Sequence, residues 1–445
     1  MLFRSGSNGI AGSTSLVKGG AGKLTINTAN SFTGGINLNG GELIVGNAAA
    51  LGATSNVVAF GAASNAFLTL SNLGVTVGGL TGDATATVRN GGSSADAVLT
   101  VGGSATTVFG GSLVDGAGSK KLGLTTAGTA TFVLTGANTY TGATSVGAGT
   151  TLQVGNGGTA GSLGASAVTV GAGGVLAFKR SDSVAYPGTV LGAGSVNVLT
   201  GTLALTGALS NSGTNTVAAG ATLQVGDGVT NGLVGNVTAN GTLAFANNGT
   251  TQTYASTVTG TGSVNFSSGT VLLSGSLANT GANVISSGAT LQIGDGTANV
   301  SFSGTVTDNG TLAFNLNSTP YTYGAAVSGS GALSVLGGTL VLSTGSSYTG
   351  GTVIASGATL QLGTNGTGGS IVGNVNTAGT LVINRGPLAT STASFNGNIT
   401  GTGGLTLSGS GIVTLGGTAS SFSGSTVIGK GTLKAGAANV LSPNS

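Results

Sequence analysis

The stretch that decides the fold is "TGANTYTGATSVGAGTTLQVG", which runs from Thr135 to Gly155. It consists of a turn rich in glycine, an aromatic residue, a second turn and a short apolar run. Related phrases are "NTANSFTGGINLNGGELIVG" from Asn27, "STGSSYTGGTVIASGATLQLG" from Ser343 and "GTASSFSGSTVIGKGTLKAG" from Gly417. Phrases that recur in this way are the sequence signature of a repeat architecture.

Three separate phrases keep a common period along the chain. The "TLQ" phrase places leucine at Leu152, Leu223, Leu291 and Leu360, with spacings of 71, 68 and 69. The "GTLAF" phrase and its variants place it at Leu176, Leu243, Leu312 and Leu381, and a third phrase carries Val196, Val264, Leu333 and Leu405. We therefore predict a higher-order repeat of about 69 residues. Three apolar phrases per repeat give a smaller step of about 20–25 residues, the length of one coil of a wide β-solenoid.

Each apolar phrase alternates as a half-buried strand does. In "ATLQVG", Leu223 and Val225 face one way while Thr222 and Gln224 face the other, and "GTLAF" should place Leu243 and Phe245 inward and Thr242 and Ala244 outward. Gly, Asn and Ser bracket every run, as turns require. The expected strands are about four to six residues long, and no segment has a helical period.

The predicted fold is all-β, a parallel β-helix (β-solenoid) of about 20 coils. One coil cannot bury its apolar side alone, so stacked coils must share their hydrogen bonds and core. We expect residues 1–445 to form a single continuous solenoid. It comprises N-terminal coils (1–122), units of about 69 residues (123–435) and a C-terminal tail (436–445).

The phrase from Gly128 to Gly155, "GTATFVLTGANTYTGATSVGAGTTLQVG", resembles the autotransporter-associated β-strand repeat, also called the passenger-associated transport repeat. Residues 16–53 resemble a second copy, and residues 97–122 resemble the strand pair that often precedes a repeat. Copies near 205–226 and 273–294 are degenerate and lack the aromatic residue. The resemblance implies a right-handed β-helix exported to the bacterial surface, as an adhesin, stalk or other extended passenger.

Composition excludes several classes of protein. Glycine accounts for 90 of 445 residues, charged residues for 4%, and Cys and His are absent. Disulfides, zinc sites and histidine general bases are therefore excluded. Net charge is +3, and the densest basic spots are Lys120-Lys121 and Lys179-Arg180, so we expect no nucleic-acid binding.

Membrane insertion is not expected either. No stretch approaches 18 consecutive apolar residues, and a transmembrane β-barrel needs longer strands and more aromatic residues than these phrases offer. The start, "MLFRSGSNGIAGSTSL", has no apolar core of the kind a signal peptide needs, and the final "AANVLSPNS" does not indicate a membrane barrel. Residues 1–15 and 436–445 are too short to form a large cap.

Two kinds of recurring residue are candidates for binding. Phe32, Tyr140, Tyr348 and Phe422 occupy one place in the repeat, where a sugar-binding ladder or a packing anchor would put aromatic rings, and we favour packing. Asp227 and Asp295 occupy matching "GDG" turns. Calcium needs several carboxylates, whereas other copies have Asn156 or Thr364 there, so we favour a turn role and predict no metal site.

The segment "FKRSDS" (178–183) is the one cluster of mixed charge, with Lys179, Arg180 and Asp182. It invites comparison with a polysaccharide-lyase site, but an exposed corner with partial charge compensation is the favoured interpretation. The other acidic residues are scattered over different phrases: Glu42, Asp83, Asp96, Asp115 and Asp308. We therefore predict no catalytic residue, no cofactor and no enzymatic activity.

The first functional hypothesis is a structural subunit of a bacterial extracellular fibre, sheath or surface appendage. Solenoid ends that lack caps would stack head to tail, so the partner would be the chain itself. The alternative is a rod segment of an autotransporter-type adhesin passenger, with cell-surface or host polysaccharide as a partner. A flat threonine face is a weaker idea, because only patches such as Thr85-Ala86-Thr87 support it. Each hypothesis implies an extracellular or cell-surface location.

Overall fold

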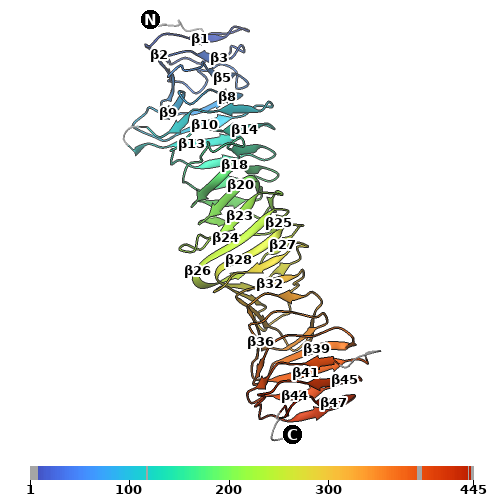
Figure 1. Ribbon diagram of the computed structural model, residues 1–445. Helices are drawn as coiled ribbons and strands as arrows, with labels where there is room; N and C mark the ends of the chain where they lie inside the picture. Colours follow the sequence, from blue (N-terminus) through green and yellow to red (C-terminus); the bar gives the residue numbers. More distant parts are fainter. Residues whose placement is uncertain (1–8, 117–118, 388–392, 439, 442–445) are drawn as a thin grey trace. The chain divides into compact units, whose positions relative to one another are not determined.

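The computed structural model describes residues 9–116, 119–387, 393–438 and 440–441, and every named element among them is a β-strand (Figure 1). Strands pair in parallel with strands of the neighbouring turns, which confirms the predicted β-solenoid of about 20 turns. The chain divides into two compact units, Met1–Leu223 with Leu233–Asn236, and Gln224–Gly232 with Val237–Ser445. Parts of the predicted terminal segments, residues 1–8, 439 and 442–445, lie outside the described residues.

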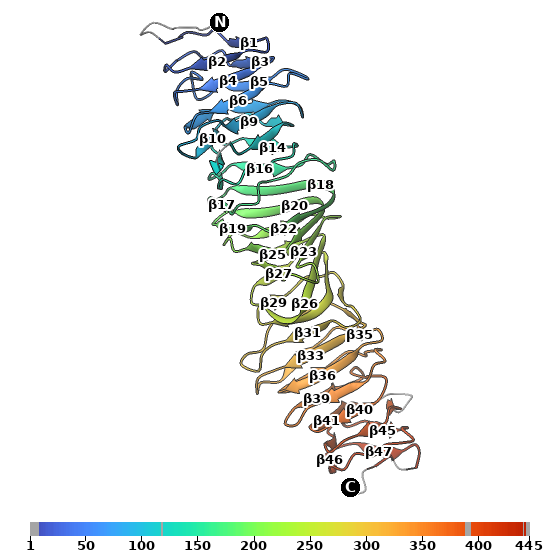
Figure 2. The same cartoon turned by 90° about the vertical axis from the view of Figure 1, so that its left-hand side faces the viewer.

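In the first unit, successive turns stack in chain order (Figure 2). One row of paired strands contains β1 (Leu16–Lys18), β3 (Ile36–Leu38), β5 (Val57–Phe60) and β8 (Gly79–Thr81). A second contains β2 (Lys23–Ile26), β4 (Glu42–Val45), β6 (Phe67–Leu70), β9 (Thr87–Asn90) and β12 (Ser112–Val114).

Two further rows complete the first unit. One contains β7 (Gly74–Val77), β10 (Ala97–Val101), β13 (Leu122–Thr126), β15 (Thr144–Val146), β17 (Val168–Val170), β19 (Thr189–Gly192), β21 (Ala208–Leu209) and β24 (Leu233–Val234). The other contains β11 (Thr107–Phe109), β14 (Thr131–Leu134), β16 (Thr151–Val154), β18 (Val175–Tyr186), β20 (Ser195–Leu205) and β22 (Asn215–Val217). The division between the units falls within β23 (Thr222–Val225).

The second unit is built in the same way. Its longest row contains β26 (Thr242–Tyr254), β28 (Ser263–Leu273), β31 (Thr290–Ile293), β33 (Thr311–Asn315), β36 (Ala332–Gly337), β38 (Thr352–Ile354), β40 (Val375–Thr377) and β43 (Ile399–Thr400). Shorter rows contain β25 (Val237–Ala239), β27 (Thr257–Thr259) and β29 (Ser276–Leu277), and β30 (Asn283–Ile285), β32 (Val306–Asp308) and β35 (Val327–Ser328).

The remaining strands of the second unit form two rows. One contains β34 (Tyr321–Tyr323), β37 (Thr339–Leu342), β39 (Thr359–Gly366), β41 (Thr380–Arg385), β44 (Gly404–Leu407) and β46 (Thr426–Ile428). The other contains β42 (Ala393–Phe395), β45 (Ile412–Leu415) and β47 (Thr432–Ala435).

The core consists of apolar ladders that run from turn to turn. Leu291 of β31 pairs with Leu312 of β33, which pairs in turn with Leu333 of β36, and all three side chains are fully buried. Because the register keeps identical faces aligned, each leucine packs on the leucine one turn away. Burial therefore stabilises the stack rather than any single coil.

The predicted alternation is correct for "ATLQVG" but incomplete for "GTLAF". Thr222 and Gln224 are partly exposed while Leu223 and Val225 are buried. Ala244, predicted to face outward into solvent, is buried at 9% exposure. The corresponding Ala313 lies in its ladder between the longer Gln292 and Ser334, and neighbours of this kind cover a small side chain.

Four strands are about twice as long as predicted. β18 has 12 residues, β20 has 11, β26 has 13 and β28 has 11. In the β18–β20 pair the register shifts after Phe178 and again after Lys179, and an equivalent pair of shifts interrupts β26–β28. Extra residues on one strand bend the ladder around a corner, so two short strands merge into a long one.

Glycine is required at corners where the backbone turns left-handed and passes close to a neighbouring turn. Gly155 has φ of 81°, and a Cβ there would lie 2.5 Å from the carbonyl oxygen of Lys179. Gly363 has φ of 86°, and its Cβ would lie 2.6 Å from the carbonyl oxygen of Asn384. A side chain at either position would both strain the backbone and collide with the next turn.

Candidate binding site

Charged residues meet at one corner of the first unit. Lys23 begins β2, Glu42 begins β4 and Phe67 begins β6, and the parallel register places the three directly opposite one another. Two residues after Phe67 on β6, Thr69 lies opposite Arg89 on β9. Four successive turns therefore supply one continuous cluster, which we call the Glu42 cluster.

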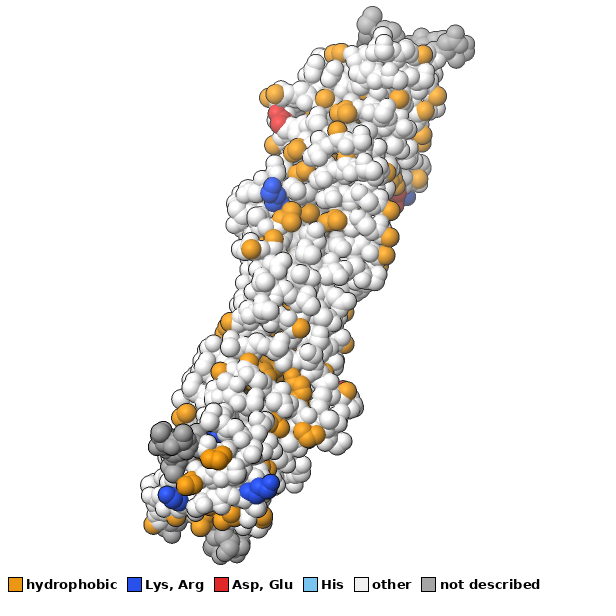
Figure 3. Space-filling model, turned by 90° about the vertical axis from the view of Figure 1, so that its right-hand side faces the viewer, with side chains coloured by type: hydrophobic (Ala, Val, Ile, Leu, Met, Phe, Trp, Pro, Cys, Tyr) orange, Lys and Arg blue, Asp and Glu red, His pale blue; other side chains and the backbone are white. Residues whose placement is uncertain are grey.

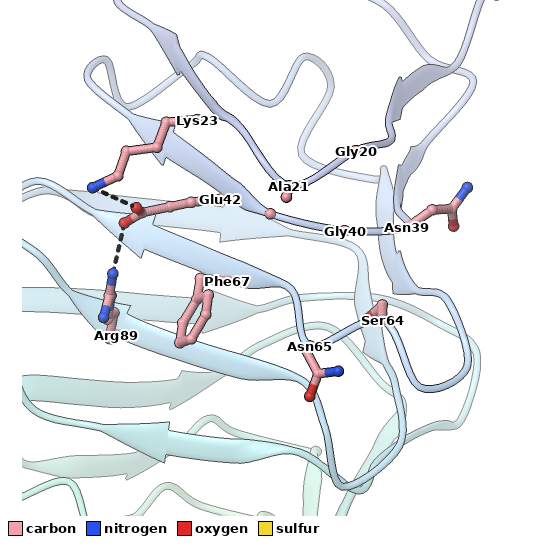
Figure 4. A pocket seen from close by; sticks show the side chains of 11 residues that line it. Gly20, Ala21, Lys23, Asn39, Gly40, Glu42, Ser64, Asn65, Phe67 and Arg89 are labelled. Atoms are coloured by element: carbon pink, nitrogen blue, oxygen red, sulfur yellow. Dashed lines mark hydrogen bonds and ion pairs between the residues drawn. The ribbon is translucent and has the colours of Figure 1, made fainter.

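Glu42 is the centre of this cluster (Figure 4). Its Oε1 atom accepts hydrogen bonds from Arg89 Nη2 at 2.8 Å and from Thr69 Oγ1 at 2.7 Å, and its Oε2 atom lies 3.1 Å from Lys23 Nζ. The Arg89 guanidinium also donates through Nε to Thr69 Oγ1 at 3.1 Å and lies 4.5 Å above the centre of the Phe67 ring. Such charge-assisted and cation–π contacts fix the guanidinium in one orientation.

The electrostatics of the cluster keep Glu42 ionised. Burial by itself raises the pKa of Glu42, but hydrogen bonds from Arg89, Thr69 and Lys23 outweigh it and lower the pKa to about 2. A carboxylate with so low a pKa holds no proton near neutral pH, so it is unsuited to general acid–base chemistry. Its oxygens are also occupied, which leaves the cations as the groups with spare hydrogen-bond donors.

A groove of about 630 Å³ lies beside the Glu42 cluster. Lys23, Glu42, Phe67 and Arg89 line one wall, and corner turns line the other, with Gly20, Ala21, Asn39, Gly40, Gly41, Ser64 and Asn65 (Figure 4). Behind the turns, the buried Lys18 ammonium donates to the carbonyl oxygens of Gly19, Gly20 and Gly40 at 3.0, 2.8 and 2.9 Å. These bonds tie two adjacent corners together and hold the wall in place.

The sequence did not predict this site, because Glu42 was counted among the scattered acidic residues and its partner Arg89 lies 47 residues away. A signal was present, however. The phrases "KLTI", "ELIV", "FLTL" and "TVRN" each occupy one turn, and aligning them turn by turn brings Lys23, Glu42, Phe67 and Arg89 together.

The recurring aromatic residues lie elsewhere and are inaccessible. Phe32, Tyr140, Tyr348 and Phe422 are each 0% exposed, which fits packing anchors and rules out a surface ladder for sugars at these positions. The Tyr140 hydroxyl lies 2.7 Å from Thr144 Oγ1, and the Tyr348 hydroxyl lies at the same distance from Thr352 Oγ1. Burial raises the pKa of Tyr140 to about 12.

The paired aspartates occupy turns. Asp227 Oδ1 accepts backbone N–H bonds from Val229 at 2.9 Å and Thr230 at 2.6 Å. Asp295 Oδ1 accepts from the backbone and the hydroxyl of Thr297 at 2.9 and 2.6 Å. Among the residues that the structure describes, no three His, Cys, Asp or Glu side chains lie close enough to hold a metal ion.

The "FKRSDS" segment forms part of long strand β18. Arg180 pairs with Asp182, with 2.7 Å between Nη2 and Oδ2, and also donates to the carbonyl oxygens of Thr159 and Gly161. The Arg180 side chain is 12% exposed, so it clamps the preceding corner loop more than it faces solvent. Arg385 is its counterpart in the second unit and donates to Gly369 and Thr367 at 2.9 and 2.6 Å.

The other acidic residues have separate local partners. Asp83 Oδ2 accepts from the backbone of Ala63 at 2.7 Å, and Asp96 Oδ1 accepts from the backbone of Lys121 at 2.9 Å. Asp115 Oδ2 accepts from the Thr141 hydroxyl at 2.7 Å. Asp308 is 0% exposed, and burial raises its pKa to about 6.

Comparison with known proteins connects these features to a family. Residues 16–45, 124–154, 337–362 and 405–435 match the model of the passenger-associated transport repeat. The chain carries passenger-associated transport repeats. This confirms the resemblance inferred from the phrase Gly128–Gly155, and each matched copy contains one of the four buried aromatic residues.

A curated relative is the BmaC autotransporter adhesin of Brucella suis biovar 1 (strain 1330). It is 34% identical to this chain over 226 residues, which cover 48% of this chain and 6% of the relative. The chain therefore corresponds to a small part of that protein's length. No solved structure matches significantly. None of the described residues forms a helix long and apolar enough to cross a membrane.

The family model does not match the two degenerate copies of the transport repeat, and the structure shows what replaces the Tyr–Thr pair there. Asn211 and Asn215 have the four-residue spacing of Tyr140 and Thr144, and Asn279 and Asn283 repeat it. All four asparagines are buried, and Asn211 Nδ2 donates to Asn215 Oδ1 at 2.9 Å. A pair of amides thus replaces a pair of hydroxyls at one corner.

Proposed function

We propose that this chain is a segment of an autotransporter-type adhesin passenger at the bacterial surface. The observation that carries the proposal is the set of four passenger-associated transport repeats on a stacked parallel solenoid, together with the similarity to an autotransporter adhesin. Such stacking suits a support, because each turn contacts only its neighbours and can be added without changing the others.

The passenger acts by binding and spacing, not by catalysis. The Glu42 carboxylate is held ionised by Arg89, Thr69 and Lys23, so it cannot donate a proton near neutral pH. Side chains on the face in Figure 3 are mostly uncharged, with isolated basic and acidic groups. A weakly charged lateral surface suits a support that must avoid unspecific contacts with nucleic acid or membranes.

Surface labelling tests the location. Antibodies raised against the purified chain should bind intact bacteria that carry the gene, and external protease should abolish the signal. A cytoplasmic protein of the same cells, labelled only after permeabilisation, is the control. Labelling of this chain that also requires permeabilisation would contradict the proposal.

A head-to-tail fibre subunit is the second candidate, favoured by a charge content of 4%, which keeps repulsion between copies low. Sedimentation velocity over a series of concentrations distinguishes the two. A fibre subunit forms progressively larger species, whereas a passenger segment keeps one sedimentation coefficient.

A further inference from the structure

We propose that the groove beside the Glu42 cluster binds a carboxylate-bearing saccharide. The proposal goes beyond a role as support, and binding can be measured on the chain whether or not it is exported. The volume of the groove, about 630 Å³, lies in the range of about 300–1,000 Å³ that is usual for ligand sites.

The charge of the groove favours an anion. Lys23 and Arg89 line it against a single carboxylate, that of Glu42, so the lining side chains carry one excess positive charge. Two more charged residues contact the turns around the groove: Lys18 donates to Gly20, and Asp83 accepts from Ala63. Their charges are opposite, so together they leave the excess positive charge of the lining unchanged. Because both Glu42 oxygens already have cationic or hydroxyl partners in Arg89, Thr69 and Lys23, the charge of Glu42 is largely compensated, and an incoming carboxylate meets the remaining N–H donors of the two cations.

The spare donors belong to two side chains of different mobility. The Lys23 side chain is 71% exposed and uses one interaction, with Glu42. Arg89 uses Nε and Nη2 in the bonds described above, and its Nη1 atom has no described partner. A fixed guanidinium beside a mobile ammonium can hold one carboxylate from two directions.

The rest of the lining favours a sugar over a peptide side chain or a phosphate. Phe67 is partly buried and offers the ring surface that Arg89 leaves uncovered for the C–H groups of a pyranose. Exposed Asn39 and Asn65 offer amides for its hydroxyl groups. The groove also follows the stacking direction over four turns, as a linear glycan would require.

Calorimetric titration of the full chain tests the proposal with oligogalacturonate, a chain of uronic acids, and with its methyl-esterified form as a matched neutral ligand. We expect binding of the free acid, and at least tenfold weaker binding of the ester. Binding of the acid should weaken further with salt.

Two variants test the location of the site and leave Glu42 itself in place. Lys23→Gln removes the exposed positive charge while Arg89 and Thr69 still hold Glu42, and Ala21→Asp adds a repelling charge on the opposite wall, so each should weaken binding roughly five- to tenfold. Lys430→Gln, at an exposed lysine of the second unit, is the matched control and should change nothing.

Several outcomes would overturn the inference. These are no binding of either oligosaccharide at millimolar concentration, equal binding of acid and ester, or an equal loss in Lys430→Gln. Equally tight binding of a polyglutamate peptide would reject the saccharide class and leave only unspecific attraction of carboxylates.

Discussion

The hydroxyl groups of Tyr140 and Thr144 lie 2.7 Å apart in the interior of the first unit, where both side chains are buried. The pair recurs at Tyr348 and Thr352. At the corresponding place near the N-terminus, Phe32 and Ile36 are both apolar and both buried. In these copies the two positions therefore change together, from apolar pair to hydroxyl pair to amide pair, because a polar group buried there needs its partner on the other side chain. The last copy combines buried Phe422 with Thr426, which is partly exposed.

The first prediction concerns coupling within this pair. Tyr140→Phe or Thr144→Val alone should lower the free energy of unfolding by about 1–2 kcal/mol, since each leaves one buried hydroxyl without its partner. The double variant should lose less than the sum of the two, because it removes both polar groups and leaves an apolar pair like Phe32 and Ile36. Urea denaturation of the four proteins measures the coupling, and additive losses would show that the hydroxyl groups act independently.

The second prediction concerns the amide pair. Asn211 Nδ2 donates to the carbonyl oxygens of Gly194 and Gly213 at 2.8 and 3.0 Å, besides Asn215 Oδ1 at 2.9 Å. Asn211→Leu nearly preserves the volume but removes every donor, so it should lower the free energy of unfolding by about 1–3 kcal/mol. Exposed Asn240→Leu is the control, and an equal loss there would assign the effect to the added apolar surface.

The sequence predicted the stacked strands well because the apolar ladder repeats at nearly every turn. Leu291, Leu312 and Leu333 can be aligned by spacing alone, and the same spacing puts them in register. The sequence did not predict the features that depend on contacts between turns. The β18 strand continues through a bend that the sequence does not mark, and Glu42 meets Arg89 across the single intervening strand β6. The alternation within one phrase is enough to predict a strand, whereas a site built from several turns depends on how the strands of those turns are paired.

The third prediction concerns Asp308, which is fully buried and has a raised pKa of about 6. A carboxyl whose folded pKa is raised binds its proton more tightly when folded, so it favours folding below about pH 4. It loses that contribution as the pH rises to about 6. The shift from 3.8 corresponds to about 3 kcal/mol. Asp308→Asn should therefore stabilise the protein at pH 7 and remove the dependence between pH 4 and 6.

Hydrogen exchange of the second unit between pH 4 and 7, corrected for the intrinsic pH dependence of exchange, measures this effect. Asp227→Asn is the control, because turn N–H groups of Thr230 and Val229 lower the pKa of exposed Asp227 and restrict its influence to more acidic conditions. Identical pH profiles for the wild type and Asp308→Asn would contradict the prediction.

The fourth prediction gives the first unit the opposite pH dependence. Glu42 has a pKa lowered from 4.5 to about 2, so its ion pairs stabilise folding above about pH 4.5, and the contribution disappears as the pH falls through 2. The shift corresponds to roughly 3 kcal/mol at neutral pH. Glu42→Gln keeps the shape but leaves Arg89 without its anion, so it should destabilise the first unit at pH 7 and match the wild type near pH 2.

Because Asp308 acts in the other unit, hydrogen exchange resolved by residue should show acid weakening the turns around Glu42 while it strengthens those around Asp308. A parallel response of both regions to acid would mean that net charge, and not these two carboxylates, controls the pH dependence.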